Sequence, residues 1–170
     1  MAFSPAIPPS VQNSLGSSIP LTKERYWLAS GSRDKFISIF DSESNYDLVS
    51  VLDHHTATIT SLKFNQVHKI IKNDLQQEVT LISSSADKSL AMHQVDVDCM
   101  AKTKNVAEMG ESVDQREILK QNKIEMYKTK IFSMDVAEQA QYMVIGQSDS
   151  LSLVKLPKLE KIWEKKFGDE

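Results

Sequence analysis

Apolar and polar residues alternate in short runs along this chain, and the runs repeat. Residues 26–41 contain two such runs, joined by a Gly-Ser-Arg-Asp turn, and the second run is rich in β-branched and aromatic side chains. This pattern predicts two short strands in a hairpin. The same pattern returns at residues 81–95 and 142–156. A hairpin that recurs at intervals of about 55 to 60 residues indicates an internal repeat.

Further strands are predicted between and after these hairpins. Residues 46–52, 59–64, 130–136 and 159–167 each carry apolar residues at the spacing of a half-buried strand. Residues 117–126 can form either a strand or a short helix, because good helix formers lie there. We favour the strand, because the repeat requires one at this point.

Three segments do not fit the repeat. Residues 1–24 hold four of the five prolines, so we expect a poorly ordered arm. The alternative is an insertion in a repeat whose first strand ends at Ala2 and Phe3. Within the repeat region 25–170, the polar segment 65–78 and the long charged segment 96–128 are predicted to be insertions.

Composition narrows the class of protein. The chain has 170 residues, of which 41% are hydrophobic and 25% charged, so it is long enough for a globular core. A net charge of -3 weighs against a general nucleic-acid binder. The single cysteine, Cys99, excludes an intrachain disulfide and favours a reducing compartment. No apolar run approaches the roughly 18 residues of a membrane span, and the N-terminus lacks the features of a secretory signal. We therefore expect a soluble intracellular protein.

When the units are aligned, they share one order of features. An Ile/Val-x-x-Leu/Val-x-Phe strand comes first, followed by a Leu-x-Ser-x-Ser strand, an Asp turn and an Ile-x-Ile-x-Asp strand, and a strand ending in Leu-x-x-His closes the unit. This order resembles the WD repeat of β-propellers, whose blades are four-stranded sheets of about 40 to 45 residues. The best match combines Ser30 and Asp34 with the run at 37–41, and the likeness covers residues 26–167.

The resemblance implies an all-β fold with about three four-stranded antiparallel blades of an incomplete WD-repeat β-propeller. Propellers close with roughly four to eight blades, so three blades cannot form a ring alone. The expectation is therefore a piece of a larger protein, a truncated chain, or a subunit completed by another chain. Expressed alone, such a chain would expose apolar faces and oligomerise or aggregate.

The chain also has a narrower likeness to the propeller region of large scaffold proteins related to mitogen-activated protein kinase-binding protein. This likeness lies in short segments, namely residues 27–30 with 33–35, 52–55 with 59–64, 86–89, and 134–136 with 145–149. This resemblance implies a non-enzymatic protein–protein interaction module of a scaffold that is cytoplasmic and can associate with the cytoskeleton. The alternative is a structural subunit of a large cytoskeletal or ribonucleoprotein assembly. The expected partners are other proteins, including further blades of the same or another chain; no cofactor, nucleic acid or membrane partner is expected.

His55, Ser83 and Asp87 are the residue types of a hydrolase triad. The chain has no Gly-x-Ser-x-Gly elbow, and the resemblance implies a different role. In a WD repeat, the histidine lies in the loop entering the blade, the serine in its second strand and the aspartate in the next turn. A hydrogen-bond chain among them would tie the loop to the sheet. Ser30 and Asp34 occupy the matching positions of the first unit and are assigned to a network of the same kind.

The chain departs from the repeat at several positions. The tryptophan that usually ends the third strand is replaced by Phe40, His93 and Lys155, and the third unit has Tyr127 for the loop histidine and Ile145 for the strand serine.

The four histidines, His54, His55, His68 and His93, raise the question of zinc. Adjacent histidines rarely face one metal, and no Cys-x-x-Cys set accompanies them. We expect one network histidine, three solvent-facing ones and no metal.

Lysines surround Trp163 and Phe167 near the C-terminus. A basic-aromatic stretch can contact RNA or anionic lipid, but Glu160 and Glu164 interleave with these lysines. A solvated outer strand is the favoured interpretation, because lysines on an edge strand discourage aggregation between sheets.

Overall fold

The computed structural model describes residues 1–3, 26–42, 45–71, 74–95, 119–137 and 141–168, and the account that follows is confined to them. Within these ranges the chain forms strands joined by turns and loops, and it contains no helix able to cross a membrane. Most of the predicted arm at 1–24, residues 96–118 of the second insertion and Cys99 lie outside the described residues.

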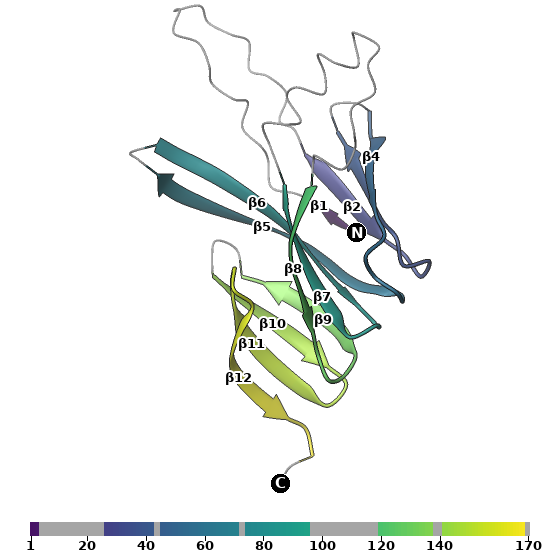
Figure 1. Ribbon diagram of the computed structural model, residues 1–170, viewed down its shortest axis with the longest axis vertical. Coiled ribbons are helices and arrows are strands. Elements are labelled where there is room, and N and C mark those ends of the chain that lie inside the picture. Colours follow the sequence, from purple (N-terminus) through teal and green to yellow (C-terminus); the bar gives the residue numbers. More distant parts are fainter. Residues whose placement is uncertain (4–25, 43–44, 72–73, 96–118, 138–140, 169–170) are drawn as a thin grey trace, which may run out of the picture.

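Three four-stranded antiparallel sheets make up the fold (Figure 1). Sheet I contains β1 (Ala2–Phe3), β2 (Trp27–Gly31), β3 (Ile37–Asp41) and β4 (Asp47–Leu52). Sheet II contains β5 (Ile59–Ile71), β6 (Asp74–Ser85), β7 (Ser89–Val95) and β8 (Leu119–Met126). Sheet III contains β9 (Ile131–Val136), β10 (Tyr142–Gln147), β11 (Ser150–Lys155) and β12 (Glu160–Lys166).

Strands that follow one another along the chain are neighbours in each sheet. The prediction of an all-β fold with about three four-stranded blades is confirmed, and the sheets do not close into a ring. Two points that the sequence left open are also resolved. Residues 119–126 form a strand and not a helix, and Ala2 and Phe3 pair with β2 as an edge strand of sheet I.

The strand predicted at 59–64 is longer than expected. β5 continues to Ile71, and β6 begins at Asp74, so both strands run through the polar segment 65–78 with an unbroken antiparallel register. Backbone N–H and C=O groups pair in such a ladder whatever the side chains are, so polar residues can extend a ribbon that starts in an apolar core. In Figure 1 this ribbon projects beyond the other two sheets.

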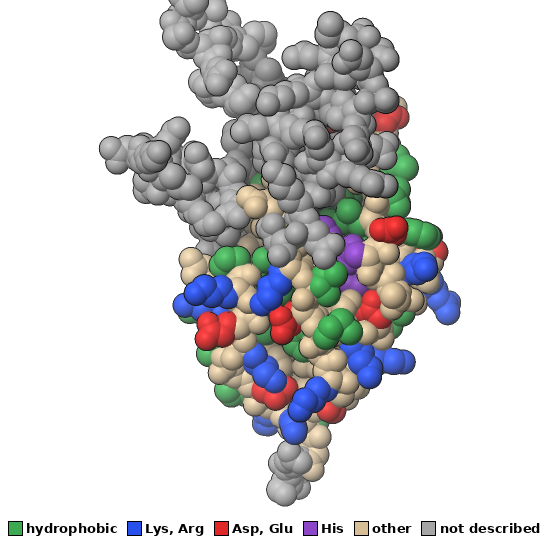
Figure 2. Space-filling view, in the orientation of Figure 1, with side chains coloured by type: hydrophobic (Ala, Val, Ile, Leu, Met, Phe, Trp, Pro, Cys, Tyr) green, Lys and Arg blue, Asp and Glu red, His purple; other side chains and the backbone are tan. Residues whose placement is uncertain are grey.

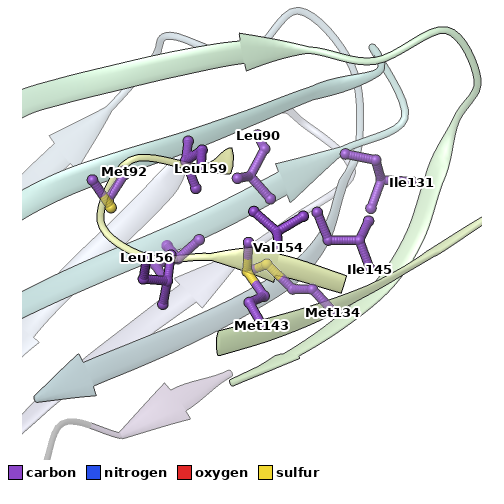
Figure 3. Close-up of a cluster of buried hydrophobic side chains, with 10 residues drawn as sticks. Leu90, Met92, Ile131, Met134, Met143, Ile145, Val154, Leu156 and Leu159 are labelled. Atoms are coloured by element: carbon purple, nitrogen blue, oxygen red, sulfur yellow. The ribbon is translucent and has the colours of Figure 1, made fainter. Parts of the chain in front are cut away.

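Apolar side chains fill the space between successive sheets. One buried cluster joins sheets I and II and contains Trp27, Ala29, Ile37, Ile39, Ile59, Leu62, Val79, Leu81 and Val95. A second joins sheets II and III and contains Ile82, Leu90, Met92, Ile131, Met134, Met143, Ile145, Val154, Leu156 and Leu159 (Figure 3). Sheet II therefore packs on both of its faces. Side chains that alternate along its strands point to opposite faces, so one set contacts sheet I and the other contacts sheet III.

Gly31 allows sheets I and II to approach closely. A Cβ atom at this position would lie 2.5 Å from Cγ2 and 2.9 Å from Cβ of Ile59. Real Cβ atoms do not tolerate such distances, so a side chain here would push the sheets apart.

Candidate functional site

His55 lies in the loop 53–58 that connects sheet I to sheet II, and its side chain is buried, with 1% exposure. Its Nε2 atom is 2.8 Å from Oγ of Ser83, and its Nδ1 atom is 2.8 Å from Oγ of Ser89 and 3.3 Å from Oδ2 of Asp87. The structure thus brings together the three residues that the repeat pattern singled out. It adds Ser89, which the sequence analysis missed. We call these four residues the His55 network.

The hydrogen bonds of the His55 network can all run in one direction, from Ser83 through His55 and Ser89 to Asp87. Geometry assigns the proton of His55 to Nδ1, which donates to Ser89, while Nε2 accepts from the Ser83 hydroxyl. Ser89 in turn donates its hydroxyl proton to Asp87. His54 Nε2 lies 3.3 Å from Ser83 Oγ and can donate to it. A neutral His55 therefore satisfies every member of the network, as buried polar groups require.

The carboxylate of Asp87 also accepts hydrogen bonds from backbone amides. Its Oδ2 atom accepts a 2.8 Å hydrogen bond from the Thr56 amide, and its Oδ1 atom accepts one of 2.8 Å from the Ser89 amide. Two further bonds act nearby: the Ser85 hydroxyl donates to the Ala57 carbonyl at 3.1 Å, and the residue 86 amide donates to the residue 58 carbonyl at 2.9 Å. The loop 53–58 is therefore fastened to the β6–β7 turn along most of its length.

The surroundings shift the pKa values of these groups. Burial lowers the pKa of His55, although Asp87 opposes this shift. Burial raises the pKa of Asp87, but hydrogen bonds from Ser89 and Thr56 together with His55 outweigh it, so the net shift is downward. At neutral pH the site therefore contains a neutral imidazole beside a carboxylate.

The His54 ring packs against the rings of both His55 and His93, and this corrects the expectation that His54 and His93 face solvent. The rings of His54 and His55 have centroids 4.2 Å apart, and those of His54 and His93 lie 4.4 Å apart. His93 is only 2% exposed and His54 is half-buried. Burial, followed by the neighbouring histidine charges, lowers the pKa of His54 to about 4 and that of His93 to about 3.

The side chain of His68 lies outside the described residues. Among the residues that are described, no group of three His, Cys, Asp or Glu side chains is arranged to hold a metal ion.

Ser30 and Asp34, the matching residues of sheet I, do not come together in the same way. Asp34 is exposed, and its Oδ1 atom accepts from the Phe36 amide at 3.1 Å within its own turn. Ser30 lies opposite Ser38 in the ladder. No hydrogen bond joins Ser30 to Asp34 in the part of the chain that the structure describes.

Sheet III has a different network at the matching place. Asp149 Oδ1 accepts from the Thr129 hydroxyl at 2.8 Å, and the Gln147 amide donates to the same Thr129 oxygen at 2.9 Å. The Ser152 hydroxyl donates to Gln147 Oε1 at 3.2 Å. Thr129 and Gln147 thus link the loop to the Asp149 turn, although each lies two residues beyond Tyr127 and Ile145, which stand at the histidine and serine positions of the repeat. The one sequence signal for this network is the place of Asp149 in the repeat.

The geometry of the His55 network resembles a hydrolase triad, but its burial is incompatible with that chemistry. A nucleophilic serine must touch the carbon that it attacks. Ser83 has 0% exposure and His55 has 1%, so a substrate has no access to the serine oxygen. What the arrangement can do is hold the loop 53–58 in one position.

The comparison with known families agrees with this interpretation. Residues 46–94 match the family described as "WD domain, G-beta repeat", and this range includes all four residues of the His55 network. Residues 46–94 are therefore similar to one WD repeat. This confirms the resemblance drawn from the sequence, and WD repeats generally act as protein-interaction modules without enzymatic activity.

Curated relatives extend the likeness beyond this one repeat. The chain is 29% identical over 126 residues to WD repeat-containing protein 62 of Mus musculus, an alignment that covers 72% of this chain and 6% of the relative. It is 31% identical over 122 residues to mitogen-activated protein kinase-binding protein 1 of Mus musculus, covering 72% of this chain and 7% of the relative. The chain therefore spans a small fraction of the length of these relatives.

Solved structures are also similar to this chain, and one of them is Sqt1 from Chaetomium thermophilum. Sqt1 matches with a TM-score of 0.47 and 21% identity, over 84% of this chain and 32% of that chain.

Proposed function

We propose that this chain is a non-enzymatic protein–protein interaction module of a cytoplasmic WD-repeat scaffold. The single observation that supports this most is the burial of the His55 network, which fixes the loop 53–58 and keeps the Ser83 hydroxyl out of reach of a substrate. A cytoplasmic location rests on the single cysteine of the chain.

The proposed contact surface is the rim formed by residues 32–36, 53–58, 86–88, 127–130 and 148–149. Backbone hydrogen bonds connect these segments in sequence, from Ile59 N–H to the Ser32 carbonyl, from Ala86 to Thr58, from Tyr127 to Lys88 and from Ser148 to Lys130. The segments therefore lie along one continuous edge of the three sheets. A surface held by backbone bonds loses little conformational entropy when a partner binds, which favours affinity.

The charge of the rim differs from that of the whole chain. Its exposed charged residues are Arg33, Asp34, Lys35, Asp53, Lys88, Lys128, Lys130 and Asp149, so basic residues outnumber acidic ones. The whole chain has a net charge of -3, and Figure 2 shows lysines, arginines and acidic residues interspersed over one face of the molecule. A partner with an acidic contact surface fits such a rim.

The first partner to test is a mitogen-activated protein kinase, since one relative is described as a protein that binds such a kinase. The full chain is immobilised, and kinase binding is measured by biolayer interferometry at two salt concentrations. The double variant Lys35→Glu/Lys88→Glu reverses two exposed rim charges and is expected to bind about tenfold more weakly. Its matched control is the double variant Lys158→Glu/Lys165→Glu, which reverses two exposed charges off the rim, one in the turn between β11 and β12 and one in β12.

The two variants separate the possible results. Binding that the rim variant weakens and the control leaves unchanged supports the proposal. Equal weakening by both variants would assign the effect to net charge and not to the rim. Absence of kinase binding by the folded wild-type chain would rule out this partner.

A further inference from the structure

The two junctions along the rim differ in net charge. The exposed charged rim residues around the junction of sheets I and II are two basic and two acidic ones, Arg33, Asp34, Lys35 and Asp53. Those around the junction of sheets II and III are three basic and one acidic, Lys88, Lys128, Lys130 and Asp149. The net charge is therefore zero at the first junction and +2 at the second, so the basic excess of the rim lies where sheet II meets sheet III.

Backbone hydrogen bonds bring the three lysines of the second junction to one place. The Tyr127 amide donates to the Lys88 carbonyl at 2.8 Å, so Lys128 follows directly beside the β6–β7 turn. The Ser148 amide donates to the Lys130 carbonyl at 3.2 Å, which joins the same loop to the β10–β11 turn. In Figure 1 these three connections lie along one edge of the molecule. We call Lys88, Lys128 and Lys130 the lysine cluster.

The lysine cluster is not neutralised by acidic side chains in the part of the chain that the structure describes. All three lysines are exposed, and no described ion pair includes any of them. The carboxylate of Asp87 is only 10% exposed and belongs to the His55 network. Asp149 is exposed, but its Oδ1 atom accepts from the hydroxyls of Thr129 and Ser150. The three ammonium groups can therefore bind an anion from outside the chain.

The loop that carries two of these lysines is held in place before any ligand binds. Thr129, which lies between Lys128 and Lys130, accepts from the Gln147 side-chain amide at 2.9 Å and donates to Asp149 at 2.8 Å. The backbone amides of Lys128 and Thr129 donate to no residue that the structure describes. Successive backbone amides of a fixed loop are donors that anions bind, and a fixed loop loses little entropy on binding.

The chemistry of the lysine cluster favours a phosphate over a carboxylate. Arginine binds carboxylates through its planar fork, whereas the lysine ammonium is a compact point charge that binds phosphate without such geometry. A phosphorylated serine or threonine carries about −1.5 to −2 charges at pH 7 and three strong acceptor oxygens. Three ammonium groups and a net charge of +2 complement that group in both number and charge.

We propose that the lysine cluster binds a phosphoserine or phosphothreonine of a partner protein. This inference rests on the proposed function, because the phosphate would belong to a protein that contacts the same rim. It adds the chemical group that this contact recognises.

The test is a titration of the full 170-residue chain with the peptide Ala-Gly-Ala-pSer-Ala-Gly-Ala, followed by nuclear magnetic resonance of the backbone amides. The amide signals of Lys128 and Thr129 are expected to shift and to reach saturation. The same peptide with unmodified serine should produce no shift. The peptide with aspartate in place of phosphoserine should bind at least about tenfold more weakly, because it has one charge and fewer acceptor oxygens.

Two glycine variants form a matched pair for this titration. Lys88→Gly removes a charge from the lysine cluster, and Lys35→Gly removes one from the matching turn of sheet I. The two lysines have φ angles of 73° and 74°, a region that glycine adopts without strain, so both variants should stay folded. Lys88→Gly and Lys128→Gln are each expected to weaken phosphopeptide binding about fivefold, whereas Lys35→Gly should leave it unchanged.

Four results would overturn this proposal. They are no phosphopeptide binding by the folded chain, equal affinity for the phosphoserine and aspartate peptides, equal weakening by Lys35→Gly and Lys88→Gly, and tighter binding of a single-stranded oligouridylate than of the phosphopeptide. The last result would assign the lysine cluster to nucleic acid. The kinase experiment fails separately. Kinase binding without phosphopeptide binding would reject this inference and keep the proposed function, whereas phosphopeptide binding without kinase binding would support this inference and reject only that kinase as the partner.

Discussion

Replacing Asp87 by alanine removes the acceptor that joins the loop 53–58 to sheet II. The carboxylate is only 10% exposed, and it accepts hydrogen bonds from the Thr56 amide, from both the amide and hydroxyl of Ser89, and from His55. Thr56 is exposed, so water can replace its lost bond, but Ser89 and His55 are buried. A buried donor left without a partner costs about 1–3 kcal/mol. Since Ser89 can still accept from His55, we expect a total loss of about 2 kcal/mol.

The assay is urea unfolding followed by far-ultraviolet circular dichroism. It is carried out at one fixed protein concentration, because any association of a folded protein makes its apparent stability depend on concentration. The expected result is a lower midpoint with an unchanged m-value. Asp34→Ala is the matched control, because Asp34 occupies the same place in the turn of sheet I but is exposed and bonded within its own turn. Equal losses in the two variants would refute the reasoning, since burial of the His55 network would then contribute nothing.

Three further predictions test the packing and the histidines by the same unfolding assay. Gly31→Ala should lower the free energy of unfolding by about 1–3 kcal/mol, because the added Cβ atom would meet Ile59. Gly146→Ala should lower it clearly less, because its Cβ atom would meet a rotatable serine hydroxyl at 2.7 Å. A larger loss in Gly146→Ala than in Gly31→Ala would contradict the packing described for Gly31. His93→Phe should keep or raise stability, because the buried Nδ1 atom of His93 has no hydrogen-bond partner among the residues that the structure describes. A loss above about 1 kcal/mol would show that this nitrogen is paired. Lowering the pH from 7 to 5 should destabilise the wild-type chain. Folding lowers the pKa of His54 from 6.5 to about 4 and that of His93 from 6.5 to about 3. Below pH 6.5 the unfolded chain therefore binds more protons than the folded chain. The stability that is present above pH 6.5 is lost as the pH falls toward 3. The His93 contribution at pH 5 is about 2 kcal/mol, and His93→Phe should remove it; a pH dependence unchanged in that variant would contradict the assignment.

Local patterns were sufficient to predict the three sheets. Alternating apolar residues and Asp turns in register specify strands and their order, because each strand must bury one or both faces against a neighbour. The same register placed His55, Ser83 and Asp87 close enough to be proposed as a network. Their positions within the repeat were enough to predict the contact between His55 and Ser83, although these residues are 28 positions apart in the sequence.

Features that depend on three-dimensional packing were not predictable in this way. The stacking of His54 on His93 depends on how deeply the loop enters sheet II, and residue type alone favoured solvent exposure. The polar extension of β5 and β6 is held by backbone pairing, which leaves no apolar signature. In sheet III, the residue that donates to Asp149 is Thr129 and not Tyr127 at the histidine position, and no repeat pattern marks that threonine.

The central claim is that buried side chains hold the loop 53–58 in a fixed position at the rim, and hydrogen–deuterium exchange of the Thr56 amide tests it most directly. Thr56 is an exposed residue, but its amide donates to Asp87 at 2.8 Å. The account predicts that this amide exchanges as slowly as the Ala86 amide, which donates to the Thr58 carbonyl, and that Asp87→Ala speeds its exchange at least about tenfold. Exchange of the Thr56 amide at the rate of an unstructured loop in the wild-type chain would contradict the account.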